Sequence, residues 1–235
     1  MNTTIGKPSN QRLAIEQLEE LQQFPTPTIA NAIETFHVRP RETGVTDSRM
    51  RCLFPNLGPV VGYACTATIL SDRAPSVPRR VSRRNYWECI RSSGKPCISV
   101  VQDLSSVAGG AYWGEVNASL HKSLGSLGVI TNGTVRDLEE VRRVGFHFFA
   151  SGVQVSHGYA HLEDFDVPVE VFGMSVNPGD LLHADQHGAV VIPHEVAHAV
   201  AAAARRVETG EKPMLAACRL ENPIDELDRL IPPEY

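Results

Sequence analysis

The chain has 235 residues, of which 42% are hydrophobic and 21% are charged, and its formal net charge at pH 7 is −5. These proportions are ordinary for a globular protein. A chain of this length can bury a core large enough to be stable without disulfides or bound metal ions. The negative charge argues against nucleic acid as a main partner, because phosphate binding requires a basic surface. No stretch reaches about 18 consecutive apolar residues, so we expect no membrane span and no membrane partner.

Five cysteines occur without a Cys-x-x-Cys pair, at Cys52, Cys65, Cys89, Cys97 and Cys218. Their odd number and wide spacing favour reduced and mostly buried thiols over disulfides or metal ligands. The amino-terminal residues are polar and lack the apolar core of a secretion signal. We therefore predict a cytoplasmic protein.

Hydrophobic periodicity and turn residues predict a mixture of helices and strands, which indicates a single α/β domain. Leucines at helical spacing predict a first helix over residues 11–24, which Pro25 ends, and Thr28 is the expected cap of a second helix. A long alanine-rich helix is expected over residues 195–209, closed by Gly210. The remaining expected elements are strands over residues 50–53, 60–69, 97–103, 146–150, 167–172, 181–183 and 189–192, and helices over residues 85–92, 138–143 and 224–230.

Five arginines crowd the segment over residues 71–84, namely Arg73, Arg79, Arg80, Arg83 and Arg84. A basic run of this kind is usually a solvated face or a contact with a partner. It can also bind the distal carboxylates of a polyanionic substrate. The sequence leaves both interpretations open.

Several other polar residues are weaker candidates for a site. Asp103 ends a predicted buried strand, where α/β proteins place functional groups, so we expect it to support a site rather than to form one. His157 and His161 are four residues apart, as in some zinc sites, but no His-Glu-x-x-His motif accompanies them. We therefore favour loop roles for these two histidines and a turn role for His187.

One stretch, over residues 109–140, gathers polar groups of the kinds that bind ions. A helix is predicted over residues 116–127, closed by Gly128, and a strand is predicted directly after it. Asn132-Gly133 is a strong turn signal that would end this strand. A helix and a strand that fold back in this way bring the start of the helix close to the loop after the strand.

The groups at these two ends would form a pocket with definable chemistry. The first N–H groups of a helix, beside Gly114 and Glu115, lack internal partners and suit a small anion. Arg136 offers a planar fork of donors that fits a carboxylate. The carboxylates of Asp137 and Glu115 suit Mg²⁺ or Mn²⁺, and such a cation can stabilise an enolate as a C–C bond of an α-keto acid breaks. Alternatively, Glu115 only favours the helix start, and Arg136-Asp137 is a surface ion pair or Asp137 a helix cap.

The spacing of these residues resembles the pattern of class II 4-hydroxy-4-methyl-2-oxoglutarate aldolases and RraA-like proteins, the latter named for a regulator of ribonuclease E activity. The family pattern is an acidic residue, twenty intervening positions, Arg-Asp, two further positions and a second acidic residue. Here Glu115, Arg136-Asp137 and Glu140 stand at these places, and the resemblance extends over residues 24–193. The family commonly has Asp where this chain has Glu115.

The resemblance implies a fold, a division of the chain and an assembly. The expected fold is a single-domain ββα sandwich of the swivelling, phosphohistidine-like type over residues 24–210. A polar segment with a helix, residues 1–23, would precede it, and a tail, residues 211–235, would follow it. The family usually forms trimers or dimers of trimers, so a homotrimer or homohexamer is expected.

The resemblance also implies an activity and roles for the site residues. The expected protein is a divalent-metal-dependent lyase that cleaves a C–C bond in a pyruvyl-containing keto acid. Candidate substrates are 4-hydroxy-4-methyl-2-oxoglutarate, 4-carboxy-4-hydroxy-2-oxoadipate and oxaloacetate. Asp137 would bind Mg²⁺ or Mn²⁺ directly, and Glu115 would hold metal-bound water and take part in proton transfer. The substrate carboxylate would bind Arg136 and the backbone of Gly114, Glu115, Val116 and Asn117.

Two alternatives remain open at this point. Some RraA-like proteins are non-catalytic regulators that bind a protein partner such as a ribonuclease, although the complete acidic set of this chain favours an enzyme. The same fold can also carry a different hydroxy-acid or keto-acid activity.

Overall fold

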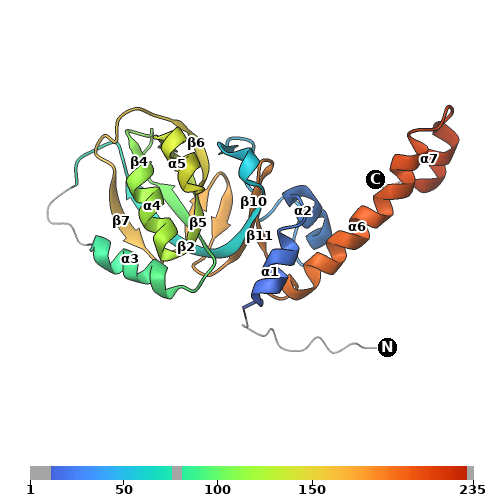
Figure 1. The fold of residues 1–235 in the computed structure, drawn as a ribbon, viewed down its shortest axis with the longest axis horizontal. Coiled ribbons are helices and arrows are strands. Elements are labelled where there is room, and N and C mark those ends of the chain that lie inside the picture. Colours follow the sequence, from blue (N-terminus) through green and yellow to red (C-terminus); the bar gives the residue numbers. More distant parts are fainter. Residues whose placement is uncertain (1–11, 76–80, 232–235) are drawn as a thin grey trace.

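The computed structural model describes residues 12–75 and 81–231, so the predictions for Arg79 and Arg80 lie outside the described residues (Figure 1). The helices are α1 (Ile15–Leu21), α2 (Thr26–Glu34), the short 3-10 helix η1 (Pro55–Leu57), α3 (Arg83–Ser92), α4 (Glu115–Leu124), α5 (Leu138–Val144), α6 (Ala197–Ala217) and α7 (Ile224–Leu230). The strands are β1 (Arg51–Cys52), β2 (Val60–Leu70), β3 (Cys97–Asp103), β4 (Ala111–Trp113), β5 (Ser126–Val135), β6 (His147–Val153), β7 (His161–Phe165), β8 (Val169–Val171), β9 (Met174–Val176), β10 (Leu181–Asp185) and β11 (Gly188–Ile192).

Nine strands of the described ranges join in one mixed sheet, and β8 and β9 pair as a separate hairpin. The order across the sheet is β1-β6-β5-β3-β2-β10-β11, with β4 paired to β5 and β7 paired to β2. The central strands β2, β3, β5 and β6 are parallel, so they need crossover connections, which contain α3, α4 and α5. These three helices cover one face of the sheet and the β8–β9 hairpin packs on the other. The predicted ββα sandwich is confirmed.

Three apolar clusters hold these layers together. One lies between the sheet and α3, α4 and α5 and includes the fully buried Trp113. A second lies under the β8–β9 hairpin and includes Met174, and a third joins α1, α2 and α6 to β10 and β11 and includes Ile29. Full burial of a large apolar side chain contributes roughly 1.5–3 kcal/mol. The first cluster therefore fixes α3 and α4 firmly on the sheet.

The central stretch differs from the prediction in two places. The residue that closes α4 is Gly125, in a left-handed conformation with φ 106°, rather than Gly128. Asn132-Gly133 does not turn the chain, because β5 continues through both residues. The Asn132 amide explains the second difference, since its Oδ1 accepts the Asp103 N–H at 2.7 Å and its Nδ2 donates to the Asp103 carbonyl at 2.9 Å. A side chain thus extends the hydrogen bonding between β3 and β5.

Two helix boundaries near the ends of the chain also need correction. α2 begins at Thr26, before the predicted cap Thr28, and the Thr26 N–H donates to Oδ2 of the remote Asp185 at 2.9 Å. α6 continues through Gly210, where it was expected to end, and through Pro213. A glycine inside a helix costs only about 1 kcal/mol relative to alanine, so a long alanine-rich segment can continue past it. In Figure 1 the carboxyl-terminal half of α6 extends away from the sheet, with α7 beside it.

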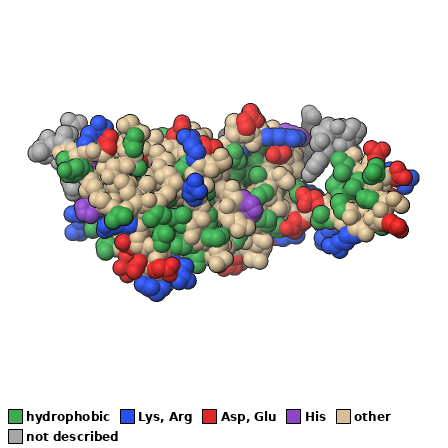
Figure 2. Space-filling view, turned by 90° about the horizontal axis from the view of Figure 1, so that it is seen from above, with side chains coloured by type: hydrophobic (Ala, Val, Ile, Leu, Met, Phe, Trp, Pro, Cys, Tyr) green, Lys and Arg blue, Asp and Glu red, His purple; other side chains and the backbone are tan. Residues whose placement is uncertain are grey.

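The surface carries both acidic and basic side chains, and the thiols differ in burial. Acidic and basic side chains lie in small mixed groups on the face shown in Figure 2. Cys65 and Cys97 are buried as predicted, whereas Cys218 is exposed. Within residues 12–75 and 81–231, no helix has both the length and the apolar character needed to cross a membrane.

Candidate active site

A pocket of about 250 Å³, here called the site pocket, lies where the amino-terminal ends of α3 and α4 meet the connection after β5. Ligands of α/β proteins commonly bind at the carboxyl ends of parallel strands, and β5 ends here. Five of the predicted site residues line the pocket: Gly114, Val116, Asn117, Arg136 and Asp137. The fold therefore brings the two ends of the central stretch together.

Asp137 has an unusual backbone and a remote partner. It precedes α5 with φ 58° and ψ 47°, a left-handed conformation that costs a non-glycine residue roughly 1–2 kcal/mol. Its side chain does not cap α5, and Oδ2 instead accepts the backbone N–H of Glu115 at 3.0 Å. Strained residues of this kind are often found at functional sites, and here the strain holds a carboxylate in the pocket.

Arg136 and Asp137 form a loose pair beside each other. The Arg136 Nε atom lies 3.7 Å from Asp137 Oδ2, and both side chains are more than one third exposed. The Arg136 N–H donates to the Trp113 carbonyl at 2.9 Å, which ties the connection after β5 to the end of β4. The guanidinium is thus held near the start of α4 with its outer donors available to a ligand.

Gly114 is required by the close packing of Asp137. A Cβ atom at this position would lie 2.4 Å from Asp137 Oδ2 and 3.2 Å from Arg136 Cγ. Its φ of −155° is extended backbone that any residue adopts, so the constraint is space rather than conformation. Any side chain here would push the Asp137 carboxylate out of its place.

Glu115 reaches the site through its backbone. Its N–H binds Asp137, but its side chain is exposed and does not line the site pocket. The predicted roles of its carboxylate in holding water and moving protons stay predictions. The second acidic residue of the motif, Glu140, lies 3.5 Å from the guanidinium of Arg143 on the same helix.

A buried histidine that the sequence reasoning missed supports the first turn of α4. The ring of His121 lies 4.5 Å from that of Trp113 and 5.6 Å from that of Tyr86, and its Nδ1 is 2.7 Å from the Asn117 carbonyl. Burial lowers the pKa of His121 to about 4, so at neutral pH the ring is uncharged and Nδ1–H donates to that carbonyl. Asn117 is held a second time by its amide, which donates to the Tyr112 carbonyl at 2.6 Å. The spacing of Asn117 and His121, one helical turn, was the available signal.

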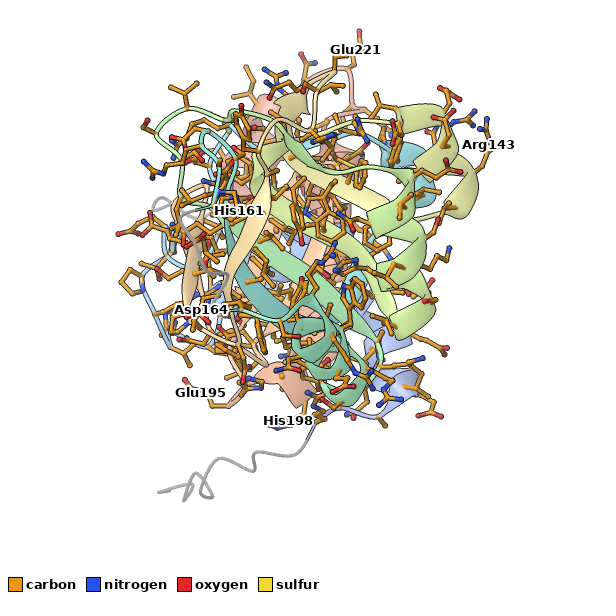
Figure 3. The ribbon with its side chains drawn as sticks, turned by 90° about the vertical axis from the view of Figure 1, so that its left-hand side faces the viewer. Arg143, His161, Asp164, Glu195, His198 and Glu221 are labelled. Carbon is orange, nitrogen blue, oxygen red and sulfur yellow. The ribbon has the colours of Figure 1, made fainter. Side chains whose placement is uncertain are left out.

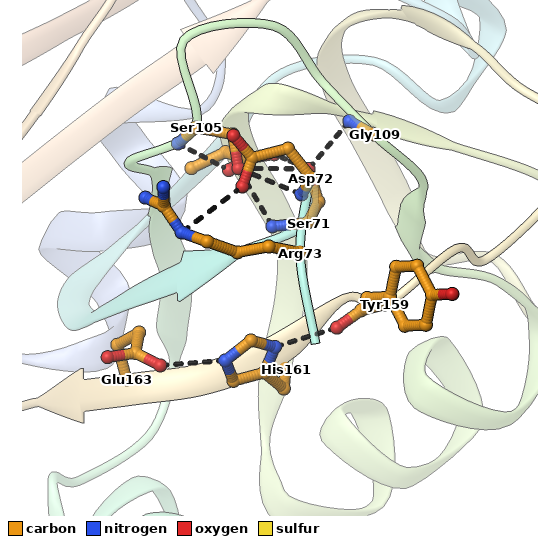
Figure 4. A network of polar contacts seen from close by, with 9 residues as sticks. Ser71, Asp72, Arg73, Ser105, Gly109, Tyr159, His161 and Glu163 are labelled. Carbon is orange, nitrogen blue, oxygen red and sulfur yellow. Dashed lines mark hydrogen bonds and ion pairs between the residues drawn. The ribbon is translucent and has the colours of Figure 1, made fainter. Parts of the chain in front are cut away.

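The rest of the pocket wall comes from α3 and from the segment around the start of β7. Arg83, Trp87, His157 and His161 line it. His161 Nδ1 lies 2.7 Å from the Tyr159 carbonyl, and its Nε2 lies 2.8 Å from Glu163 Oε1 (Figure 4). Figure 3 shows His161 and Asp164 along β7. The two histidines therefore share one pocket with Asp137, although the sequence favoured loop roles for them.

Asp103 is buried outside the site pocket and organises the loops beside it. Its Oδ2 accepts the Ser71 hydroxyl at 2.5 Å and its Oδ1 accepts the Ser105 N–H at 3.0 Å. Ser71 Oγ also accepts the Gly109 N–H at 2.9 Å, which anchors the segment that leads into β4 (Figure 4). The supporting role expected for Asp103 agrees with these contacts.

The polar groups of the site pocket fit a hydrated divalent cation. Asp137 presents a carboxylate that is 36% exposed, and its Oδ1 has no hydrogen-bond partner in the part of the chain that the structure describes. In the same ranges, no three His, Cys, Asp or Glu side chains are grouped to hold a metal ion. Mg²⁺ is commonly bound through one or two carboxylates with water completing its shell, so Asp137 is a suitable ligand.

The chain resembles known proteins over most of its length. It matches the family described as RraA-like (Aldolase/RraA) over residues 26–191. A Halalkalibacterium halodurans protein, named provisionally as a 4-hydroxy-4-methyl-2-oxoglutarate aldolase, is 25% identical over 180 residues, which cover 76% of this chain and 77% of that protein.

Two other relatives match over shorter spans. Protein DlpA of Legionella pneumophila is 28% identical over 85 residues, which are 35% of this chain and 14% of DlpA. An uncharacterised Methanocaldococcus jannaschii protein is 31% identical over 103 residues, which are 43% of this chain and 50% of that protein. The chain thus spans half or less of the length of these two relatives.

Solved structures share the fold. An uncharacterised Pseudomonas syringae protein aligns with a TM-score of 0.73 at 20% identity, covering 95% of this chain and 97% of that chain. RraAS2 of Streptomyces coelicolor, described as an unusual member of the RNase ES inhibitor RraA protein family, aligns with a TM-score of 0.67 at 23% identity, covering 86% and 96%. At these identities the likeness is one of fold alone. Because the family match extends over more than half of the sequence, the chain belongs to the RraA-like (Aldolase/RraA) family.

Proposed function

We propose that the protein is a divalent-metal-dependent lyase that cleaves a C–C bond in a pyruvyl-containing keto acid. The reaction would be that of a 4-hydroxy-4-methyl-2-oxoglutarate or 4-carboxy-4-hydroxy-2-oxoadipate aldolase, with decarboxylation of oxaloacetate as a related activity. The main support is the 3.0 Å hydrogen bond between the Glu115 N–H and Asp137 Oδ2, which joins a carboxylate to the open end of α4. The name of the Halalkalibacterium halodurans relative points to the same reaction class.

Each group of the site has a separate role in this proposal. The free N–H groups of the first turn of α4 and the Arg136 guanidinium bind the substrate carboxylate. Asp137 holds Mg²⁺ or Mn²⁺, and the role of Glu115 in orienting water and moving protons requires its exposed side chain to turn into the site pocket. When bound, the cation supplies Lewis-acid stabilisation of the negative charge that develops on the keto oxygen. Arg136 keeps the pyruvyl unit oriented while the bond breaks.

We also propose that the protein works as a homotrimer or homohexamer. Apolar side chains are exposed on and beside the site pocket, with Val116 at 80%, Val155 at 92% and Tyr159 at 62% exposure. Apolar surface of this kind next to a site is often covered by another subunit. Light scattering after size-exclusion chromatography should give the mass of three or six chains, and a monomer at micromolar concentration would argue against this assembly.

Pyruvate release tests the proposed activity. The purified protein is incubated with oxaloacetate or 4-hydroxy-4-methyl-2-oxoglutarate and Mg²⁺ or Mn²⁺, and pyruvate is measured with lactate dehydrogenase and NADH. A protein-free reaction corrects for spontaneous decarboxylation. We expect turnover that EDTA removes and excess Mg²⁺ restores. No turnover across a panel of keto and hydroxy acids would refute the proposal and favour the non-catalytic role of the RraA regulators.

A further inference from the structure

Helix α3 presents three distinct faces. Arg83 and Trp87 are four positions apart, so they lie one turn from each other on the same face, and both line the site pocket. Tyr86 points into the core and is fully buried. Arg84 lies on a solvent face, where its Nε is 3.0 Å from Glu88 Oε1. Arg83 and Arg84 are both exposed, but Arg83 lines the site pocket and Arg84 does not.

The packing of Tyr86 fixes the α3 face relative to the rest of the site. Its ring lies 5.6 Å from His121, which supports the first turn of α4, and 5.8 Å from Phe165 at the end of β7. Ser82 caps α3, because its hydroxyl oxygen accepts the Asn85 N–H at 3.4 Å. The position of Arg83 thus depends on a well-packed helix rather than on a loose loop.

Charge is unbalanced in the site pocket. Its lining contains the guanidinium groups of Arg83 and Arg136 but a single carboxylate, that of Asp137. Arg136 lies 3.7 Å from Asp137, whereas Arg83 forms no hydrogen bond or ion pair within residues 12–75 and 81–231. A ligand with one carboxylate, bound at Arg136, leaves the positive charge of Arg83, which is exposed to solvent, without an anionic partner in the same pocket. A ligand with a second anionic group compensates it.

We propose that Arg83 is the residue that binds the second carboxylate of the substrate, and that it sets the preference of this site for keto acids with an anionic group distal to the pyruvyl unit. This inference rests on the proposed function for the position of the first carboxylate. Trp87, one turn further along α3, provides an apolar surface for the carbon atoms between the two carboxylates. Of the other described arginines in the basic run, Arg73 lies 3.6 Å from Asp72 and Arg84 pairs with Glu88.

Two unreactive keto acids of equal length test this proposal without turnover. 2-Oxoglutarate and 2-oxopentanoate both carry five carbons and a pyruvyl-type end, and they differ in the terminal carboxylate. Titration calorimetry in the presence of Mg²⁺ measures the binding of each to the wild type, Arg83→Ala, Arg83→Lys and the matched control Arg84→Ala. A charge-assisted hydrogen bond is worth roughly a tenfold change in affinity or more.

We expect the wild type and Arg84→Ala to bind 2-oxoglutarate at least about tenfold more tightly than 2-oxopentanoate. Arg83→Ala should bind the two acids with affinities equal within about twofold, and its affinity for 2-oxopentanoate should equal that of the wild type. The preference of Arg83→Lys for 2-oxoglutarate should lie between those of the wild type and Arg83→Ala. The proposal is overturned if the wild type shows no preference, if Arg83→Ala keeps the preference or weakens both acids equally, or if neither acid binds.

The proposed function and this inference can fail separately. The wild type could prefer 2-oxoglutarate through Arg83 and yet release no pyruvate from any substrate. This result would refute the proposed lyase activity but support Arg83 as a carboxylate-binding residue. Pyruvate release without a preference for 2-oxoglutarate would support the lyase activity and refute the role of Arg83.

Discussion

The Glu115 N–H donates a hydrogen bond of 3.0 Å to Asp137 Oδ2, although the two residues are 22 positions apart. The bond joins the first residue of α4 to the residue before α5. It turns the carboxylate away from the helix that it precedes and toward the site pocket. The two parts of the family motif, Glu115 and Arg136-Asp137, are therefore joined by a hydrogen bond in the structure.

Asp137→Asn should nearly abolish activity. The amide keeps an oxygen that can accept the Glu115 N–H, but it removes the negative charge that would hold a cation. We expect the rate of pyruvate release to fall by at least roughly a hundredfold. Glu139→Gln is the matched control, because Glu139 lies on α5, pairs with Arg142 at 2.6 Å and does not line the site pocket. Wild-type rates in Asp137→Asn would contradict the assignment of Asp137.

Gly114→Ala should lose activity through a steric effect. The new Cβ atom would lie 2.4 Å from Asp137 Oδ2, so the carboxylate has to move. Gly210→Ala is a suitable control, because a Cβ there meets nothing within 4 Å and alanine stabilises a helix interior by roughly 0.5–1 kcal/mol. Kinetics and thermal unfolding of both variants check the prediction. An active Gly114→Ala protein would mean that the Asp137 position does not matter.

Stability should decrease as the pH falls below about 6.5. Burial lowers the pKa values of His121, His147 and His183 from 6.5 to about 4, so in this range the unfolded chain binds protons that the folded chain does not. The stabilisation is complete above pH 6.5 and is lost toward pH 4, with each histidine contributing on the order of 1–3 kcal/mol.

Urea unfolding at several pH values measures this effect. His121→Phe keeps an aromatic ring in the cluster and removes one titrating group, so the free energy of unfolding should depend less steeply on pH. The slope should decrease by up to about 1.4 kcal/mol per pH unit. An unchanged slope would show that His121 titrates normally in the folded protein.

Asp185→Ala should destabilise the fold. The Asp185 side chain is 7% exposed and accepts the N–H groups of Thr26 at 2.9 Å and of His187 at 2.8 Å. Leaving two such donors unpaired costs roughly 1–3 kcal/mol in free energy of unfolding. Asp228→Ala, at an exposed position on α7, should change it by less than about 0.5 kcal/mol. Equal effects of the two substitutions in urea unfolding would refute the role of Asp185 as a remote cap.

The sequence predicted the meeting of Glu115 and Asp137 because a helix followed directly by a strand constrains where their ends lie. It predicted β3 (Cys97–Asp103) and α7 (Ile224–Leu230) at their observed bounds, since apolar runs and flanking turn residues marked them. The prediction of a turn at Asn132-Gly133 was wrong, because the Asn132 side chain forms hydrogen bonds with Asp103 on a neighbouring strand. Such tertiary contacts are invisible in a local pattern.

Other features of the site depend on conformation that a sequence does not reveal. A left-handed Asp137 is uncommon for a residue with a side chain, and nothing in the local sequence requires it. The local sequence also does not show that Glu115 donates its backbone N–H to Asp137 while its side chain lies at the surface. Among the described arginines of the basic run, Arg83 lines the site pocket, and the packing of Tyr86 holds the helix that carries it.

A crystal structure with Mn²⁺ and pyruvate shows directly whether Asp137 holds a cation beside the substrate, because anomalous scattering locates the manganese independently of the refined coordinates. We expect a manganese ion on the Asp137 carboxylate, with the pyruvate carboxylate at Arg136 and the first turn of α4. Manganese and pyruvate bound at a different place, with Asp137 free of both, would contradict this expectation.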